Sequence, residues 1–201
     1  MNYQLIDQQA LPEILTAIEL EGMMLAANMA LEPLDPKVWL AEKMASLSDS
    51  QYQQIESQLL TQYHYLKSNQ YALLALTCDL QSLAEAAEGF MQTWPYVEQK
   101  WTEQVLNDGT ERMLQALLTT WMLAIDEAQT QQQMIAAGID NPPSLSQLKP
   151  QLDLMINEVA QAADEIQGSG HAQSVNPYKT LGRNELCSCQ SGKKFKHCCG
   201  R

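Results

Sequence analysis

Hydrophobic residues recur at every third or fourth position through most of this chain, and this spacing predicts helices. The pattern runs from about residue 14 to residue 166. Leucine, alanine, glutamine, glutamate and methionine, which favour helices, are abundant, whereas valine, which favours strands, occurs only five times. The sequence therefore predicts an all-α fold, a multi-helix bundle with little strand.

Capping residues and prolines divide the first half of this pattern. A first helix is expected from Pro12 to just before Pro33, with Gly22 as a break or bend. Two further N-terminal signals are Asp35 with Pro36, which opens a short helix, and Ser48 with Gln51, which has the spacing of a capping box. The pattern after Ser48 predicts a helix of about five turns.

The second half contains longer apolar stretches with fewer signals. Residues 70–93 form one broken helix or two helices, with a join near Cys78 and Asp79. Residues 107–109 predict a turn before one long helix, which Gly138 and two prolines close. Ser144 or Ser146 caps a last helix that ends near residue 168.

A change of composition follows this last helix. Residues 168–181 combine small residues with one proline, which is typical of a flexible linker. We therefore expect three parts: a helical body at 1–167, a linker at 168–181 and a small tail at 182–201.

The charge differs in sign between these parts. Residues 176–201 hold six basic residues and one acid, which gives a net charge of +5. Because the whole chain has a net charge of −12, residues 1–175 carry a net charge of −17. Because DNA affinity rests mainly on Lys and Arg contacts to phosphates, no direct DNA binding by the acidic body is expected. Only the basic end is suited to contact an anionic surface.

The apolar groups are short, and none approaches the run of about 20 residues that a membrane span requires. The first residues have no basic region before an apolar run, so no secretory signal is read there. The expectation is a cytoplasmic protein without a transmembrane segment.

Four of the five cysteines fall within thirteen residues: Cys187, Cys189, Cys198 and Cys199. In a cytoplasmic setting such a cluster indicates a metal site more than a disulfide framework. Four thiolates suit tetrahedral Zn²⁺, and a shell of four protein ligands leaves no position for substrate. His197 is the rival donor beside these thiols, and the lysines at 193, 194 and 196 would offset the charge of the thiolates.

The run Gly182-Arg183-Asn184, Cys-x-Cys, Ser-Gly-Lys-Lys-Phe-Lys and Cys-Cys-Gly resembles the SEC-C motif, a metal-binding tail of the export motor SecA and of other bacterial proteins. The resemblance implies Cys187, Cys189, Cys198 and Cys199 as ligands of zinc, with iron as the alternative metal. It implies the chaperone SecB, ribosomes or anionic lipid surfaces as partners. Four non-ligand positions depart from the commonest form: Glu185, Leu186, Ser188 and Gln190.

A second resemblance lies in the body. Residues 19–27 (ELEGMMLAA) and 32–40 (EPLDPKVWL) are similar to the helical YecA/YgfB-type proteins, and residues 88–90 (EGF) extend this likeness. Some proteins of that family carry the same metal tail. The resemblance implies an all-helical body.

Other residues have a structural and a functional interpretation. Cys78 is expected to be a small apolar residue of the core; the alternative is a catalytic thiol with His64 as its base. The four tryptophans are expected in the core; the alternative is that they line a ligand pocket. Four glutamates are assigned to solvated helix faces, and the alternative is a carboxylate metal site: Glu19, Glu21, Glu85 and Glu88.

Together these features predict a non-enzymatic metal-binding adaptor, whose zinc tail docks on a SecB-like chaperone or a ribosome-like partner. An enzyme with its site in the helical body is the second hypothesis. A regulator of transcription that acts through protein contacts is the third.

Overall fold

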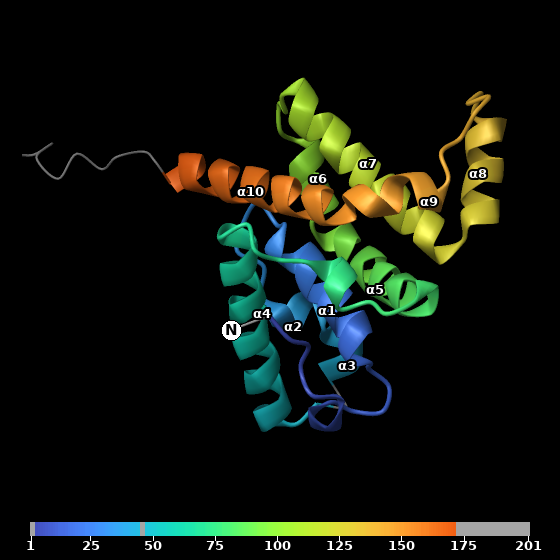
Figure 1. Cartoon of the computed structure of the whole chain (residues 1–201). Coiled ribbons are helices and arrows are strands. Elements are labelled where there is room, and N and C mark those ends of the chain that lie inside the picture. Colours follow the sequence, from blue (N-terminus) through green and yellow to red (C-terminus); the bar gives the residue numbers. More distant parts are fainter. Residues whose placement is uncertain (1–2, 45–46, 172–201) are drawn as a thin grey trace, which may run out of the picture. The chain divides into compact units, whose positions relative to one another are not determined.

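Every regular element in residues 3–44 and 47–171, the part of the chain that the structure describes, is a helix (Figure 1). The predicted all-α fold is therefore confirmed for these residues of the computed structural model. The α-helices are α1 (Ala17–Asn28), α2 (Pro36–Trp39), α3 (Ala41–Met44), α4 (Asp49–Lys67), α5 (Leu80–Thr93), α6 (Glu98–Thr102), α7 (Asp108–Ile125), α8 (Glu127–Ala136), α9 (Leu145–Leu148) and α10 (Leu152–His171). Short 3₁₀ turns lie at Gln8–Ala10, Leu73–Ala75, Trp94–Tyr96 and Lys149–Gln151.

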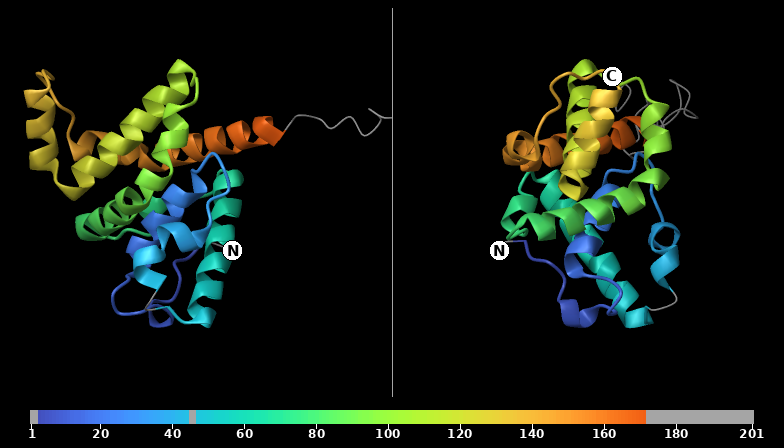
Figure 2. Two further views of the ribbon diagram at one scale, coloured as in Figure 1. Left: turned by 180° about the vertical axis from the view of Figure 1, so that it is seen from behind. Right: turned by 90° about the vertical axis from the view of Figure 1, so that its right-hand side faces the viewer.

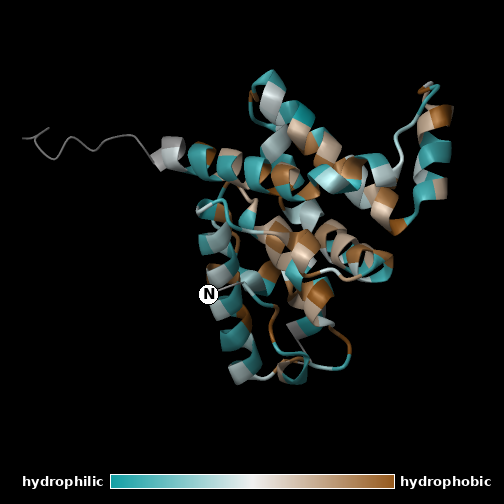
Figure 3. Cartoon of the chain, in the orientation of Figure 1, coloured by the Kyte–Doolittle hydropathy of each residue, from teal (hydrophilic) through white to brown (hydrophobic). Residues whose placement is uncertain are grey.

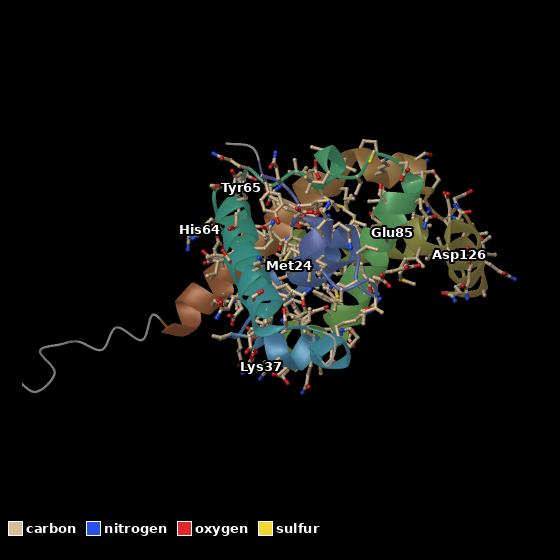
Figure 4. All side chains as sticks on the ribbon, turned by 90° about the horizontal axis from the view of Figure 1, so that it is seen from below. Met24, Lys37, His64, Tyr65, Glu85 and Asp126 are labelled. Carbon is tan, nitrogen blue, oxygen red and sulfur yellow. The ribbon has the colours of Figure 1, made fainter. Side chains whose placement is uncertain are left out.

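Helix α1 is the central helix of the body. Nine of its twelve residues are buried, including Leu20, Met24 and Leu25. Figure 4 shows α1, marked by Met24, between α4, marked by Tyr65, and α5, marked by Glu85. A helix that is apolar on nearly all sides suits such a fully enclosed position.

The contact between α1 and α5 is the most extensive one between described elements, and two glycines allow it. A methyl group on Gly22 would lie 1.9 Å from the carbonyl oxygen of Ala86, and one on Gly89 would lie 2.0 Å from that of Glu19. Each helix thus presents a glycine to the backbone of the other. The expectation that Gly22 breaks or bends the first helix is wrong, because α1 passes through it and uses it for packing.

Two hydrophobic clusters meet at α1. The smaller one joins α1 to α2, α4 and the preceding loop through Leu15, Met24, Trp39, Leu40 and Ile55. The larger one joins α1 to α5, α6, α7 and α10. In Figure 3 hydrophobic positions gather where α1 and α5 meet, whereas α4 is mostly hydrophilic.

A row of aromatic rings crosses the larger cluster. Phe90 of α5 stacks on Trp94 and on Trp121 of α7, with ring centroids 5.4 and 5.2 Å apart. Trp94 lies 6.5 Å from Trp101 of α6. These rings hold α5, α6 and α7 together.

The capping signals of the first half are confirmed. The Asp35 carboxylate accepts a hydrogen bond from Lys37 N at 2.9 Å, and Ser48 with Gln51 forms the capping box of α4. The expected short helix is divided into α2 and α3 around Leu40. The first helix begins at Ala17, with Thr16 as its N-cap, instead of at Pro12, and it ends at Asn28.

The second half differs more from expectation. The join near Cys78 and Asp79 is confirmed, because Asp79 caps α5, but the residues before it form a 3₁₀ turn at Leu73–Ala75 instead of an α-helix. The expected long helix after residue 107 is two helices, because Asp126 has an extended backbone and its carboxylate caps α8. Helices α7 and α8 therefore form a V (Figure 2). Ser144 caps α9, which a 3₁₀ turn with Pro150 separates from α10.

Helix α10 extends beyond its expected end. It continues through Gly168 to His171, into the segment expected to be a linker. The remainder of that segment and the tail at 182–201 lie outside the described residues.

We predict that Gly22→Ala lowers the free energy of unfolding by about 3 kcal/mol or more, because the new methyl group meets a backbone carbonyl that cannot move alone. Urea denaturation measures this change. Gly168→Ala is the matched control: it places a methyl group in open space on α10 and should be neutral or stabilising by up to about 1 kcal/mol. Equal effects of the two substitutions would contradict the close helix contact.

Candidate functional site

The expected metal ligands, Cys187, Cys189, Cys198 and Cys199, and the rival donor His197 lie outside the described residues. Their donor chemistry fits zinc, because four thiolates supply a complete tetrahedral shell. Within residues 3–44 and 47–171, no group of three His, Cys, Asp or Glu side chains is arranged to hold a metal ion. The candidate metal centre therefore rests on the tail cysteines.

The body contains a buried polar cluster that the sequence does not predict, and it is centred on Glu21. The side chain of Glu21 is completely buried, so its assignment to a solvated face is wrong. Glu19 and Glu85 are partly buried and Glu88 is exposed. Glu19 pairs with Lys43 at 3.3 Å instead of joining Glu21 in a metal site.

Three elements supply the hydrogen-bond donors of this cluster. Tyr3, from the segment before α1, donates to Glu21 Oε2 at 2.8 Å. Tyr71, from the loop after α4, donates to Oε1 at 2.5 Å, and Gln62 of α4 donates to the same oxygen at 2.7 Å. Both carboxylate oxygens are therefore satisfied without a cation.

A second ring of side chains holds these donors in position. The Asn28 amide donates to Gln62 Oε1 at 2.8 Å, and Gln62 also donates to the backbone oxygen of Glu21 at 3.1 Å. The Gln58 amide donates to the Tyr3 hydroxyl at 3.0 Å. The ring of Tyr3 packs edge-on against Tyr65 and Tyr71. The cluster thus ties the N-terminal segment, α1 and α4 together.

Burial determines the protonation behaviour of this cluster. It raises the pKa of Glu21 above its ordinary value, and the hydrogen bonds from Tyr71, Gln62 and Tyr3 oppose that rise. Burial also raises the pKa of Tyr71 and of Tyr3, and the negative charge of Glu21 adds to both shifts. The two phenols therefore remain protonated donors at neutral pH.

The expectation for Cys78 is wrong. Its side chain is exposed, in the loop before α5, rather than buried in the core. His64, the base proposed for a catalytic thiol, is on α4, where Figure 4 shows it pointing away from the body. No hydrogen bond joins the two within the described part of the chain.

The four tryptophans are core residues, as expected. Trp39, Trp94, Trp101 and Trp121 are at most 4% exposed. The Trp101 indole donates to the backbone oxygen of Met29 at 2.9 Å, which fixes α6 against the end of α1. Trp94 and Trp101 also line a groove on the surface.

Comparison with known proteins supports the SEC-C interpretation. Residues 183–201 match the model of the SEC-C motif, which is a zinc-binding motif. SecA, the protein translocase subunit, of Clostridium botulinum (strain Eklund 17B / Type B) is 48% identical over 46 residues, which cover 21% of this chain and 6% of that relative. SecA of Treponema pallidum (strain Nichols) is 50% identical over 52 residues, with the same coverage of 21% and 6%.

A longer match reaches into the body. SecA of a Nitratiruptor species is 26% identical over 179 residues, or 87% of this chain and 19% of the relative. The chain therefore spans less than a fifth of the length of these relatives and shows distant homology to SecA. No solved structure matches the chain. No described helix has both the length and the apolar character needed to cross a membrane.

The buried carboxyl predicts a specific pH dependence of stability. Because the pKa of Glu21 is raised in the folded chain, its contribution to stability is complete below the unfolded pKa and is lost as the pH rises through the folded pKa. We predict that wild type loses stability relative to Glu21→Gln as the pH rises from about 4.5 to 8.

Urea denaturation across that range measures the difference. Glu88→Gln, which alters an exposed carboxyl on α5, is the control and should run parallel to wild type. A difference between wild type and Glu21→Gln that is constant with pH would contradict a raised pKa at Glu21.

Proposed function

We propose that this chain is a non-enzymatic adaptor, in which a helical body carries a zinc-binding SEC-C tail that docks on a protein partner. The match of residues 183–201 to the SEC-C motif carries this proposal. In it, Cys187, Cys189, Cys198 and Cys199 hold one metal ion, with zinc preferred and iron as the alternative.

The proposed role of the metal is structural. Four thiolates fill the shell of a tetrahedral zinc ion, so no position is left for a substrate. A tail of about 20 residues has too little core to fold alone, and metal binding would supply its folding energy. The nearby lysines would offset the charge of the thiolates.

The proposed partner belongs to the export or translation machinery, such as a SecB-like chaperone or a ribosome. The repeated similarity to SecA, a protein translocase subunit, supports the export assignment. The charges of the two parts support a division of roles, because the +5 end can approach an acidic partner that the −17 remainder would repel.

No reaction is assigned to the body. Cys78 is exposed and is not joined to a histidine base by a hydrogen bond among the described residues. The carboxylate of Glu21 is enclosed by its own donors and has no exposed surface for a substrate. A role in binding is therefore favoured over catalysis.

We further propose that the body is of the YecA/YgfB type. The stretch at 19–27 forms most of α1, and Gly89 of the stretch at 88–90 lies against Glu19. Two separate parts of the resemblance thus meet in the central helix contact.

Metal analysis tests the first part of this proposal. We predict about one zinc ion per chain by elemental mass spectrometry, and loss of that ion in the double variant Cys187→Ser, Cys198→Ser. Cys78→Ser is the matched control and should keep the metal. A metal-free wild type, or an ion retained by the double variant, would overturn the assignment of the ligands.

Crosslinking in cell extract tests the partner. We predict that the intact chain captures SecB or ribosomal proteins and that the metal-free double variant loses them, while Cys78→Ser retains them. Identical partners for all three proteins would show that the metal-bound tail does not bind the partner. Capture of a DNA-binding protein in their place would favour a regulator of transcription and contradict the export assignment.

A further inference from the structure

A groove between α6 and α7 is the feature of the body that the metal-binding proposal leaves unused. It encloses about 410 Å³, within the range of about 300–1,000 Å³ that is usual for ligand pockets. Its wall includes Trp94, Trp101, Leu106, Leu114 and Leu118, so most of its large side chains are apolar.

The floor of the groove is rigid. Trp94, Trp101 and Leu114 are 3%, 2% and 9% exposed and belong to the larger hydrophobic cluster. Phe90 of the aromatic row stacks on Trp94, and the Trp101 indole donates a hydrogen bond to the backbone oxygen of Met29, so both rings are held in place. A floor that is already ordered reduces the entropy lost when a ligand binds.

The rim of the groove is acidic. Glu98 of α6 and Glu111 of α7 both line it, and no lysine or arginine does. The nearby Lys100 is already paired with Glu32 and Glu103 at 3.3 Å each. Arg112 is the other basic residue of this region, and it follows Glu111 on α7 without lining the groove. The rim therefore favours a cationic ligand over an anionic one.

The apolar surface continues beyond the groove. Val105 lies between two lining residues, Gln104 and Leu106, and is fully exposed. An aliphatic side chain in this position adds apolar area at the edge of the groove without contributing to the core. Val105 therefore extends the apolar lining of the groove to a position that a bound segment can reach.

We propose that this groove binds a basic amphipathic peptide segment of a partner protein. Its apolar side chains would cover Leu106, Leu118 and Val105, and its lysines or arginines would pair with Glu98 and Glu111. Helical peptides bind in grooves in this way, through apolar residues three and four positions apart. The inference does not depend on the metal tail.

Charge also decides against the other occupants. An anionic ligand such as a fatty acid would bring its carboxylate next to Glu98 or Glu111. The acidic part of a second copy of this chain, residues 1–175 with a net charge of −17, would be repelled by the same acidic rim. A basic segment is the occupant that both the apolar floor and the acidic rim can bind.

A model peptide tests the proposal on the full chain. The probe is a fluorescein-labelled peptide of about 14 residues, built of leucine and lysine with leucines at helical spacing. Fluorescence anisotropy at low salt gives its affinity. A peptide with glutamate in place of lysine should show no binding, and added salt should weaken the lysine peptide.

Two variants of the groove have matched controls elsewhere on the body. Glu98→Lys with Glu111→Lys should weaken binding by about tenfold or more, while Glu13→Lys with Glu165→Lys, at two exposed glutamates, should change it by less than about twofold. Val105→Asp should also weaken binding, while Ile135→Asp, at an exposed position on α8, should not. Circular dichroism verifies that each variant is folded.

Three results would overturn the proposal. Equal weakening by groove and control variants would mean that the peptide binds the acidic surface at large. Unchanged affinity in both groove variants would place the peptide elsewhere. Absence of peptide binding, together with a dimer that Val105→Asp dissociates in sedimentation experiments, would identify a second copy as the occupant.

Discussion

Backbone contact between α1 and α5, through one glycine on each helix, is the constraint on which the rest of the body depends. Gly22 lies against the carbonyl of Ala86, and Gly89 lies against that of Glu19, so neither position has room for a side chain. Two helices this close leave little space between them, and the apolar side chains of α1 must then pack against other elements. The two hydrophobic clusters on either side of α1 follow from this arrangement.

The same contact fixes the position of one polar and one apolar feature of the body, the Glu21 cluster and the groove. Glu21 precedes Gly22 and meets α4 and the N-terminal segment, where Tyr3, Tyr71 and Gln62 replace its lost hydration with hydrogen bonds. On α5, Phe90 follows Gly89 and begins the aromatic row that supports the groove. The residue next to Gly22 therefore belongs to the closed polar cluster, and the residue next to Gly89 belongs to the aromatic row below the open apolar groove.

Local signals predicted much of the fold. The all-α class, the capping of α2 and α4, and the buried tryptophans follow from spacing and caps, which act within a few residues. The role of Gly22, the burial of Glu21 and the exposure of Cys78 depend on partners distant in the chain, which periodicity does not reveal. One signal for Glu21 was present, because Leu20, Met23, Met24 and Leu25 surround it with apolar residues. The SEC-C motif could be identified from the sequence because the residues that carry it lie together at 183–201.

Helices α1 and α5 should form the most stable part of the body. Native-state hydrogen exchange, measured residue by residue on the full chain, tests this claim most directly. We expect the amides of α1 and α5 around Gly22 and Gly89 to exchange only through global unfolding, and those of α8, which has one buried residue, to exchange through local opening. Faster exchange in α1 than in α8 would contradict the claim that the glycine contact organises the body.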